Sequence, residues 1–130
     1  MSGKNKRFIL DTNAIVSLLK GNKDLHANIE TAEWVGISII SKIEFLAFPG
    51  LSEPDSELFK QFLKRIEVIG LNDGDKDLMS NIIKIRKSRK SIKLPDAIII
   101  SSALVNNCVL VTADRQLHNL DEIEVIGFEP

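Results

Sequence analysis

Short β-prone runs alternate with helix-like segments along the whole chain, and this alternation restricts the fold more than any other feature. The β-prone runs are residues 8–10, 36–41, 68–71, 109–112 and 123–126. The helix-like segments between them are residues 14–19, 25–34, 41–48, 53–66, 78–85 and 97–105. Strands that alternate with helices predict βαβ units and a parallel sheet covered on both faces. We therefore expect an α/β fold, a three-layer α/β/α sandwich with a central, mainly parallel sheet.

Local signals predict where several of these segments begin and end. Gly21 and the pair Pro49-Gly50 terminate helix-like runs, and Pro95 is placed to start another. Ser41, followed three residues later by Glu44, has the pattern of a capping box, so we expect a helix to begin there. Residues 117–120 are predicted to form one helical turn.

Length, charge and cysteine content narrow the class of protein. The 130 residues predict a single domain, residues 1–130, and the net charge of −1 gives no general attraction to nucleic acid. Cys108 is the only cysteine, so no disulfide can form within the chain. No run is long enough to cross a membrane, and residues 1–7 lack the apolar core of a signal peptide. We expect a cytoplasmic protein that does not bind membranes.

Four acids share one kind of setting in the expected fold. Asp11 and Asp114 each follow a β-prone run, Glu44 lies in the first turn of a predicted helix, and Asp96 follows Pro95 at the start of another. Strand C-termini and helix N-termini lie on the same edge of a parallel sheet, so these acids should converge there. Grouped carboxylates repel one another unless a cation neutralises them, and oxygen ligands alone favour Mg²⁺ or Mn²⁺.

Four segments of this sequence resemble the signature segments of PIN domains. They are residues 8–13 (FILDTN), 41–46 (SKIEFL), 94–99 (LPDAII) and 110–114 (LVTAD), and their order matches the small VapC-type toxin ribonucleases in particular. The resemblance spans nearly the whole chain. It implies a metal-dependent endoribonuclease that cuts RNA, forms a homodimer and is held inactive by a cognate antitoxin protein.

The resemblance also implies roles for individual positions. The acids that match the family's catalytic quartet are Asp11, Glu44, Asp96 and Asp114. Asp11, Asp96 and Asp114 would hold Mg²⁺ or Mn²⁺, while Glu44 would orient the attacking water or bind the metal through water. Asn13 and Thr112 match supporting polar positions. Many relatives carry a further acid after the last segment, but this chain has Arg-Gln-Leu-His at residues 115–118, so no fifth ligand is expected from there.

Residues 84–93 contain six cations and no acid. A run of this kind is most often a solvated helix face, but its position directly before Asp96 favours contact with an RNA backbone equally well. The side chains that we assign to such contacts are Arg86, Lys87, Arg89, Lys90 and Lys93. No aromatic residue lies among them, so base stacking is not expected there.

Two alternative functions need weighing. A catalytically silent PIN-like module that binds RNA or protein would conserve the same fold without cleaving RNA. A phosphorylation-switched receiver domain is disfavoured, because Asp11 has no acidic neighbour and the later strands lack the required Asp and Lys.

The histidines and aromatic residues have ordinary structural interpretations. His26 and His118 stand apart with no cysteine cluster and are not expected to bind metal, since such sites need several convergent ligands. Trp34, Phe45 and Phe48 are interpreted as core residues, with residues 48–51 as an alternative partner surface.

Overall fold

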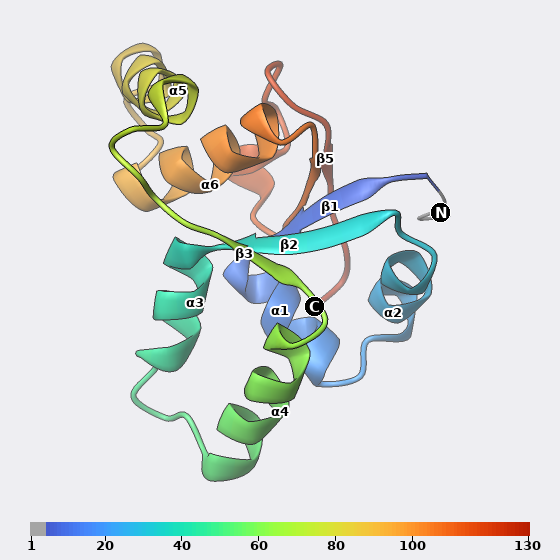
Figure 1. The fold of residues 1–130 in the computed structure, drawn as a ribbon. Helices are drawn as coiled ribbons and strands as arrows, with labels where there is room; N and C mark the ends of the chain where they lie inside the picture. The colour runs from blue at the N-terminus through green and yellow to red at the C-terminus, as the bar shows by residue number, and fades with distance from the viewer. Residues whose placement is uncertain (1–4) are drawn as a thin grey trace.

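A computed structural model describes residues 5–130 and places five strands in one fully parallel sheet with the order β3-β2-β1-β4-β5 (Figure 1). The strands are β1 (Arg7–Leu10), β2 (Trp34–Ser38), β3 (Glu67–Ile69), β4 (Val109–Val111) and β5 (Val125–Ile126). Residues 1–4 lie outside the described residues. They belong to residues 1–7, for which the sequence predicts no signal peptide.

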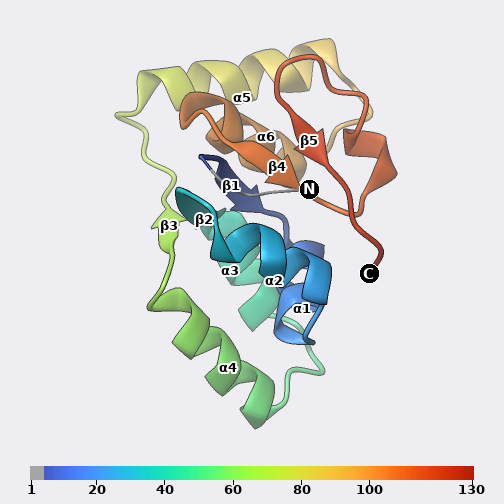
Figure 2. The same ribbon diagram turned by 90° about the vertical axis from the view of Figure 1, so that its right-hand side faces the viewer.

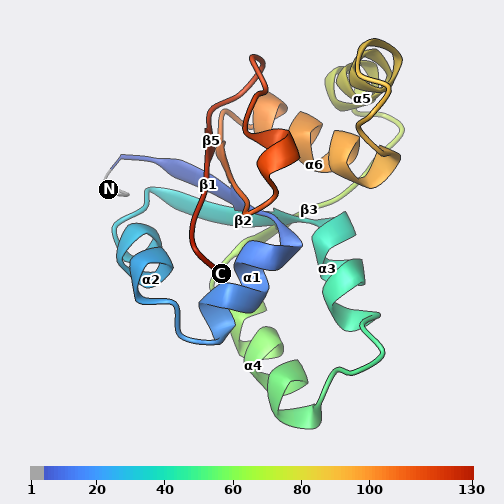
Figure 3. The same cartoon turned by 180° about the vertical axis from the view of Figure 1, so that it is seen from behind.

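Helices cover both faces of this sheet. They are α1 (Thr12–Leu19), α2 (Lys23–Glu30), α3 (Ile39–Leu46), α4 (Glu53–Leu63), α5 (Lys76–Ser88), α6 (Leu94–Val105) and the short 3₁₀ helix η1 (Arg115–Leu117). Figures 1 and 3 show α5 and α6 on one face and α1, α2 and α4 on the other, and Figure 2 shows the layers from the side. This is the predicted three-layer arrangement.

The alternation of side chains along the central strands builds a core on each face. Ile9 and Leu110 point to the layer of α5 and α6, where they pack in one buried cluster. Phe8, Leu10 and Val111 point the other way and pack with the inner faces of α1 and α4. Successive strand residues face opposite sides of a sheet, so a central strand needs apolar residues at every position, as β1 and β4 have.

Helix α6 lies deep in the structure because it is apolar around its whole circumference. Every residue from Ala97 to Ala103 is buried. Pro95 lies in the first turn, where a missing backbone N–H costs little, as the sequence predicts. Within the described residues, no helix has the length and apolar character needed to cross a membrane.

The start of α3 differs from the prediction. Strand β2 ends at Ser38, whose hydroxyl accepts a hydrogen bond from the Ile40 backbone N–H at 3.1 Å and so caps α3. The predicted capping box at Ser41 and Glu44 is therefore wrong, and Glu44 lies beyond the first turn. The β-prone pair Ile39-Ile40 suggested a longer strand. The N-cap residue Ser38 lies before this pair, however, so both isoleucines belong to the first turn of α3.

Three further expectations need correction. Trp34 begins β2 rather than ending the preceding helix, and the last helical turn is η1 instead of residues 117–120. Phe48 is not a core residue, because 63% of its surface is exposed, whereas Phe45 is 7% exposed. Phe48 follows the C-cap of α3, where the chain turns outward before α4.

Candidate active site

The register of β1 and β4 brings two polar residues together at the carboxyl edge of the sheet. Leu10 pairs with Val111, so the next residue of each strand, Asp11 and Thr112, also lies side by side. The Thr112 hydroxyl donates a hydrogen bond to Asp11 Oδ2 at 2.7 Å, and the Thr12 backbone N–H donates to Asp11 Oδ1 at 2.8 Å. Asp11 therefore caps α1 while its second oxygen is held by the neighbouring strand.

Asn13 connects this pair to the turn that follows β4. Its Nδ2 lies 3.2 Å from Thr112 Oγ1 and 3.4 Å from Asp11 Oδ2. Its Oδ1 accepts a hydrogen bond from the Ala113 backbone N–H at 3.0 Å. The structure thus brings the predicted supporting residues Asn13 and Thr112 into direct contact with Asp11.

Glu44 reaches the same rim through a residue to which the sequence analysis gave no role of its own. The Thr12 hydroxyl donates a hydrogen bond to Glu44 Oε1 at 2.7 Å, which ties the first turn of α1 to α3. Glu44 is otherwise exposed. The sequence signal that could have identified Thr12 is its position directly after Asp11. The first side chain of a helix that begins at the rim lies close to the rim.

Asp114 and Asp96 complete the group in different ways. The Asp114 carboxylate caps η1 by accepting from the Gln116 N–H at 3.0 Å, and the Asp114 N–H donates to Thr112 Oγ1 at 3.0 Å. Asp96 is half-buried in the first turn of α6, and no described residue donates a hydrogen bond to its carboxylate. Asp96 is therefore the acid with the fewest structural ties.

The four acids interact electrostatically across the rim. Burial raises the pKa of Asp11 above its ordinary value; hydrogen bonds from Thr112 and Thr12 oppose this, and the charges of Glu44 and Asp114 add to it. Burial also raises the pKa of Asp96, and the charges of Asp11, Asp114 and Glu44 raise it further, while Lys93 lowers it. Asp11 and Asp96 are thus harder to ionise, first because they are buried and second because other carboxylates are near.

The donor set suits a hard divalent cation, but the side chains are not arranged as a complete coordination sphere. All the donors are oxygens and the rim carries an excess of negative charge, which is the chemistry that Mg²⁺ and Mn²⁺ prefer. Among residues 5–130, however, no group of three or more acidic, histidine or cysteine side chains is placed so that it could hold one ion. Thr12, Thr112 and Gln116 hold three of the four carboxylates at separate positions.

The raised pKa values predict how stability depends on pH without a divalent metal. A carboxyl whose pKa is raised by folding binds protons more readily in the folded state, so its contribution is present at low pH and is lost as pH rises through the folded-state pKa. In the wild type, the melting temperature should therefore fall as pH rises above 3.8, the ordinary pKa of an aspartate. We expect this fall to be smaller in Asp11→Asn, because the substituted side chain does not ionise. Thermal unfolding in EDTA at several pH values measures this.

A matched substitution controls for the loss of one charge. Asp24 is an exposed acid in the first turn of α2, outside the rim. Asp24→Asn should not relieve the fall in melting temperature that we assign to Asp11. If the melting temperature of Asp11→Asn depends on pH as that of the wild type does, burial and repulsion do not raise the pKa of Asp11.

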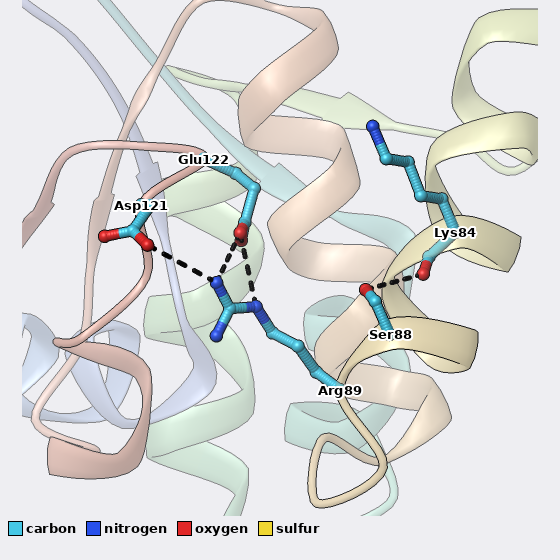
Figure 4. A network of polar contacts seen from close by, with 5 residues as sticks. All are labelled: Lys84, Ser88, Arg89, Asp121 and Glu122. Atoms are coloured by element: carbon cyan, nitrogen blue, oxygen red, sulfur yellow. Dashed lines mark hydrogen bonds and ion pairs between the residues drawn. The ribbon is translucent and has the colours of Figure 1, made fainter.

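The basic run is only partly available for a ligand. Arg89 donates through Nε to Glu122 at 3.2 Å and forms ion pairs with Glu122 and Asp121 (Figure 4). Arg86 donates to the backbone carbonyl of Ile92. In contrast, Lys87, Lys90 and Lys93 are exposed, and no described carboxylate pairs with them. Two of the five predicted RNA contacts are thus occupied by contacts within the chain.

A comparison with protein families decides the class. The sequence model described as "PIN domain" matches residues 8–123, which is most of the chain. The chain belongs to the PIN-domain family. This membership excludes the receiver-domain alternative, and the predicted resemblance to PIN domains is confirmed. A comparison with curated proteins gives no significant match.

Solved structures of toxin–antitoxin complexes share this PIN fold. One is VapBC2 from Rickettsia felis bound to a promoter DNA fragment, with 20% identity, a TM-score of 0.81, and coverage of 95% of this chain and 99% of the matched chain. VapBC-1 from nontypeable Haemophilus influenzae has 21% identity, a TM-score of 0.76, and coverage of 93% and 97%. A toxin–antitoxin complex from Klebsiella pneumoniae has 22% identity, a TM-score of 0.73, and coverage of 91% and 94%.

Proposed function

We propose that this PIN-domain protein is a Mg²⁺- or Mn²⁺-dependent endoribonuclease and the toxin of a toxin–antitoxin pair. The observation that supports this most directly is the placement of acids from four chain segments at one rim, where Thr12 and Thr112 connect Asp11, Glu44 and Asp114 by hydrogen bonds and Asp96 lies within reach of their charges. A protein gains nothing in stability from grouping carboxylates that repel one another, so the arrangement is explained best by a cation that binds there. Membership of the PIN family supports the same conclusion.

Each acid has a proposed role in this reaction. Asp11, Asp96 and Asp114 would hold the metal, which when bound supplies Lewis-acid stabilisation of the phosphodiester and lowers the pKa of a water. Glu44, which is exposed at the rim and oriented by Thr12, would accept a proton from the attacking water. Thr112 and Asn13 hold Asp11 in a fixed orientation, which reduces the cost of organising the site.

Three exposed lysines, of which Lys93 lies near Asp96 at the rim, are suited to the RNA backbone. Lys93 directly precedes α6, and Lys87 and Lys90 belong to the same basic run. These cations would provide salt-dependent affinity without sequence preference. The function of Arg86 and Arg89 would instead be to hold the connection between α5 and α6, since both side chains already have partners within the chain.

The proposal includes a cognate antitoxin, a homodimer and a cytoplasmic location for the single domain. The names of the similar solved structures describe toxin–antitoxin and VapBC complexes, which supports an antitoxin partner. The dimer rests on the family resemblance.

The test is cleavage of mixed cellular RNA by the purified, antitoxin-free protein. We expect cutting with Mg²⁺ or Mn²⁺ and none with EDTA. A folded protein that binds RNA but does not cut it under any of these conditions would instead be a silent binding module. That second candidate is favoured by one observation, the absence of a ready-formed group of three metal ligands among the described residues.

A further inference from the structure

We infer that His118 is a positioning residue that, together with Gly127, fixes the strand end bearing Thr112 and the turn bearing Asp114. The inference rests on the proposed function and deepens it. His118 Nε2 lies 2.8 Å from the backbone carbonyl oxygen of Thr112. A carbonyl only accepts hydrogen bonds, so Nε2 must carry a proton and donate it.

Thr112 connects two of the acids at the rim, Asp11 and Asp114. Its hydroxyl donates to Asp11 and accepts from the N–H of Asp114 at 3.0 Å. Its own N–H donates to the Ile126 carbonyl at 3.1 Å, across the pairing of β4 with β5. The Thr112 carbonyl is the remaining polar group of this buried residue, and His118 satisfies it. The orientation of Thr112 is thus fixed from both sides.

The same hydrogen bond closes the turn that carries Asp114. His118 is the C-cap of η1, and Asp114 is its N-cap. A bond from the His118 ring back to Thr112 therefore spans the whole turn from the end of β4 to the end of η1. The other contacts of this turn are hydrogen bonds within residues 112–118, the contact of Asn13 with Ala113 and the buried side chain of Leu117. The His118 ring is the side chain that links the end of the turn directly to its start at Thr112.

Gly127 provides the surface on which the His118 ring rests. A Cβ atom at residue 127 would lie 2.5 Å from His118 Cε1 and 3.3 Å from His118 Nε2, so any side chain there would displace the ring. Gly127 directly follows β5, beyond residues 8–123 that match the PIN family. The position of a candidate metal ligand therefore depends on the C-terminal segment of this chain.

The first test compares His118→Phe, which removes the donor, with His118→Gln, which keeps one. Loss of a partner that orients a metal ligand costs about 10–100-fold in metal affinity or activity. We expect the lower end of this range for His118→Phe, because His118 contacts Thr112 and not a metal ligand itself. We expect about tenfold weaker Mn²⁺ binding by calorimetry and about tenfold lower kcat with unchanged KM. The melting temperature of His118→Phe should fall slightly, because the buried Thr112 carbonyl loses its donor. His118→Gln should restore most of both losses.

Hydrogen exchange gives a readout that needs no activity. In His118→Phe, we expect the amides of Ala113 and Asp114 to exchange about tenfold faster, because local opening of the turn costs less free energy. His26→Phe is the matched control, since it changes the other histidine, which is exposed on α2. This variant should match the wild type in Mn²⁺ affinity, kcat and amide exchange.

A double substitution tests the part played by Gly127. Gly127→Ala alone should weaken Mn²⁺ binding as much as His118→Ala does, because it pushes the ring off Thr112. Added to His118→Ala, it should cause no further loss, since no ring is left to displace. Additive losses would overturn the role of Gly127.

The outcomes separate this inference from the proposed function. If the wild-type protein does not cut RNA, the proposed function fails, while Mn²⁺ affinity and amide exchange still decide the role of His118. Wild-type Mn²⁺ affinity and exchange in His118→Phe would overturn the inference. A loss of kcat without a change in either quantity would also overturn it, because His118 would then act on the reaction directly.

Discussion

Asp96→Asn should reduce RNA cleavage on the order of 10²–10³-fold and leave the fold intact. A bound metal contributes several kcal/mol to stabilising the transition state, and each 1.36 kcal/mol lost is about a tenfold loss in rate. The Asp96 carboxylate accepts no hydrogen bond from a described residue, and the pKa of Asp96 is raised by burial and by the charges of Asp11, Asp114 and Glu44. The neutral amide should therefore relieve repulsion without breaking a structural contact.

The measurements are initial cleavage rates at saturating RNA and a thermal melt without metal. We expect an equal or higher melting temperature for the variant, since folding no longer brings this charge close to the others. Asp24→Asn is the matched control, because Asp24 also lies in the first turn of a helix but outside the rim. Wild-type cleavage by Asp96→Asn would show that Asp96 does not hold the metal.

Phe59→Ala should lower the free energy of unfolding by about 3–5 kcal/mol, the usual cost of truncating a buried phenylalanine. Phe59 is fully buried on α4, and its ring stacks on Phe45 of α3 with centroids 4.0 Å apart and planes at 23°. A second contact joins it to Phe62 at 6.3 Å. Removing this ring leaves a cavity between α3 and α4 that neighbouring side chains can fill only in part.

Urea unfolding of the wild type, Phe59→Ala and Phe48→Ala measures this difference. Phe48 is mostly exposed, so its truncation should change the free energy of unfolding by less than about 0.5 kcal/mol. Because Phe45 directly follows Glu44, loss of Phe59 should also weaken cleavage through movement of α3. Equal stability of the two variants would contradict the core position assigned to Phe59.

The layers and the rim could be predicted from two patterns in the sequence, the short apolar runs and the polar residues that follow them. Continuous apolar runs as short as residues 8–10 and 109–111 are typical of strands covered on both faces, and the sheet places β1 at its centre with β4 beside it. In a parallel sheet, the residues that follow such strands share one edge, which is why Asp11 and Asp114 could be expected to approach each other.

Other expectations were wrong because local sequence does not show which competing contact forms. Ser38 and Ser41 are both good N-cap residues, and the pairing of β2 decided in favour of Ser38. The five RNA contacts assigned to the cationic run stay a prediction, although Glu122, far away in the sequence, pairs with Arg89. A partner that is distant in the sequence leaves no trace near the residue it binds.

The local order of residues was therefore enough to predict the α/β class and the family resemblance, which are confirmed, because the alternation of buried residues and short motifs can be seen within a few residues. The catalytic roles of the four acids stay a prediction. The contacts of Asp11 with Thr112, of Glu44 with Thr12 and of His118 with Thr112 exist only in the folded chain. They join residues that lie up to 101 positions apart, and the register of β1 on β4 sets the longest of them. Such contacts depend on how the strands align, which no short stretch of sequence encodes.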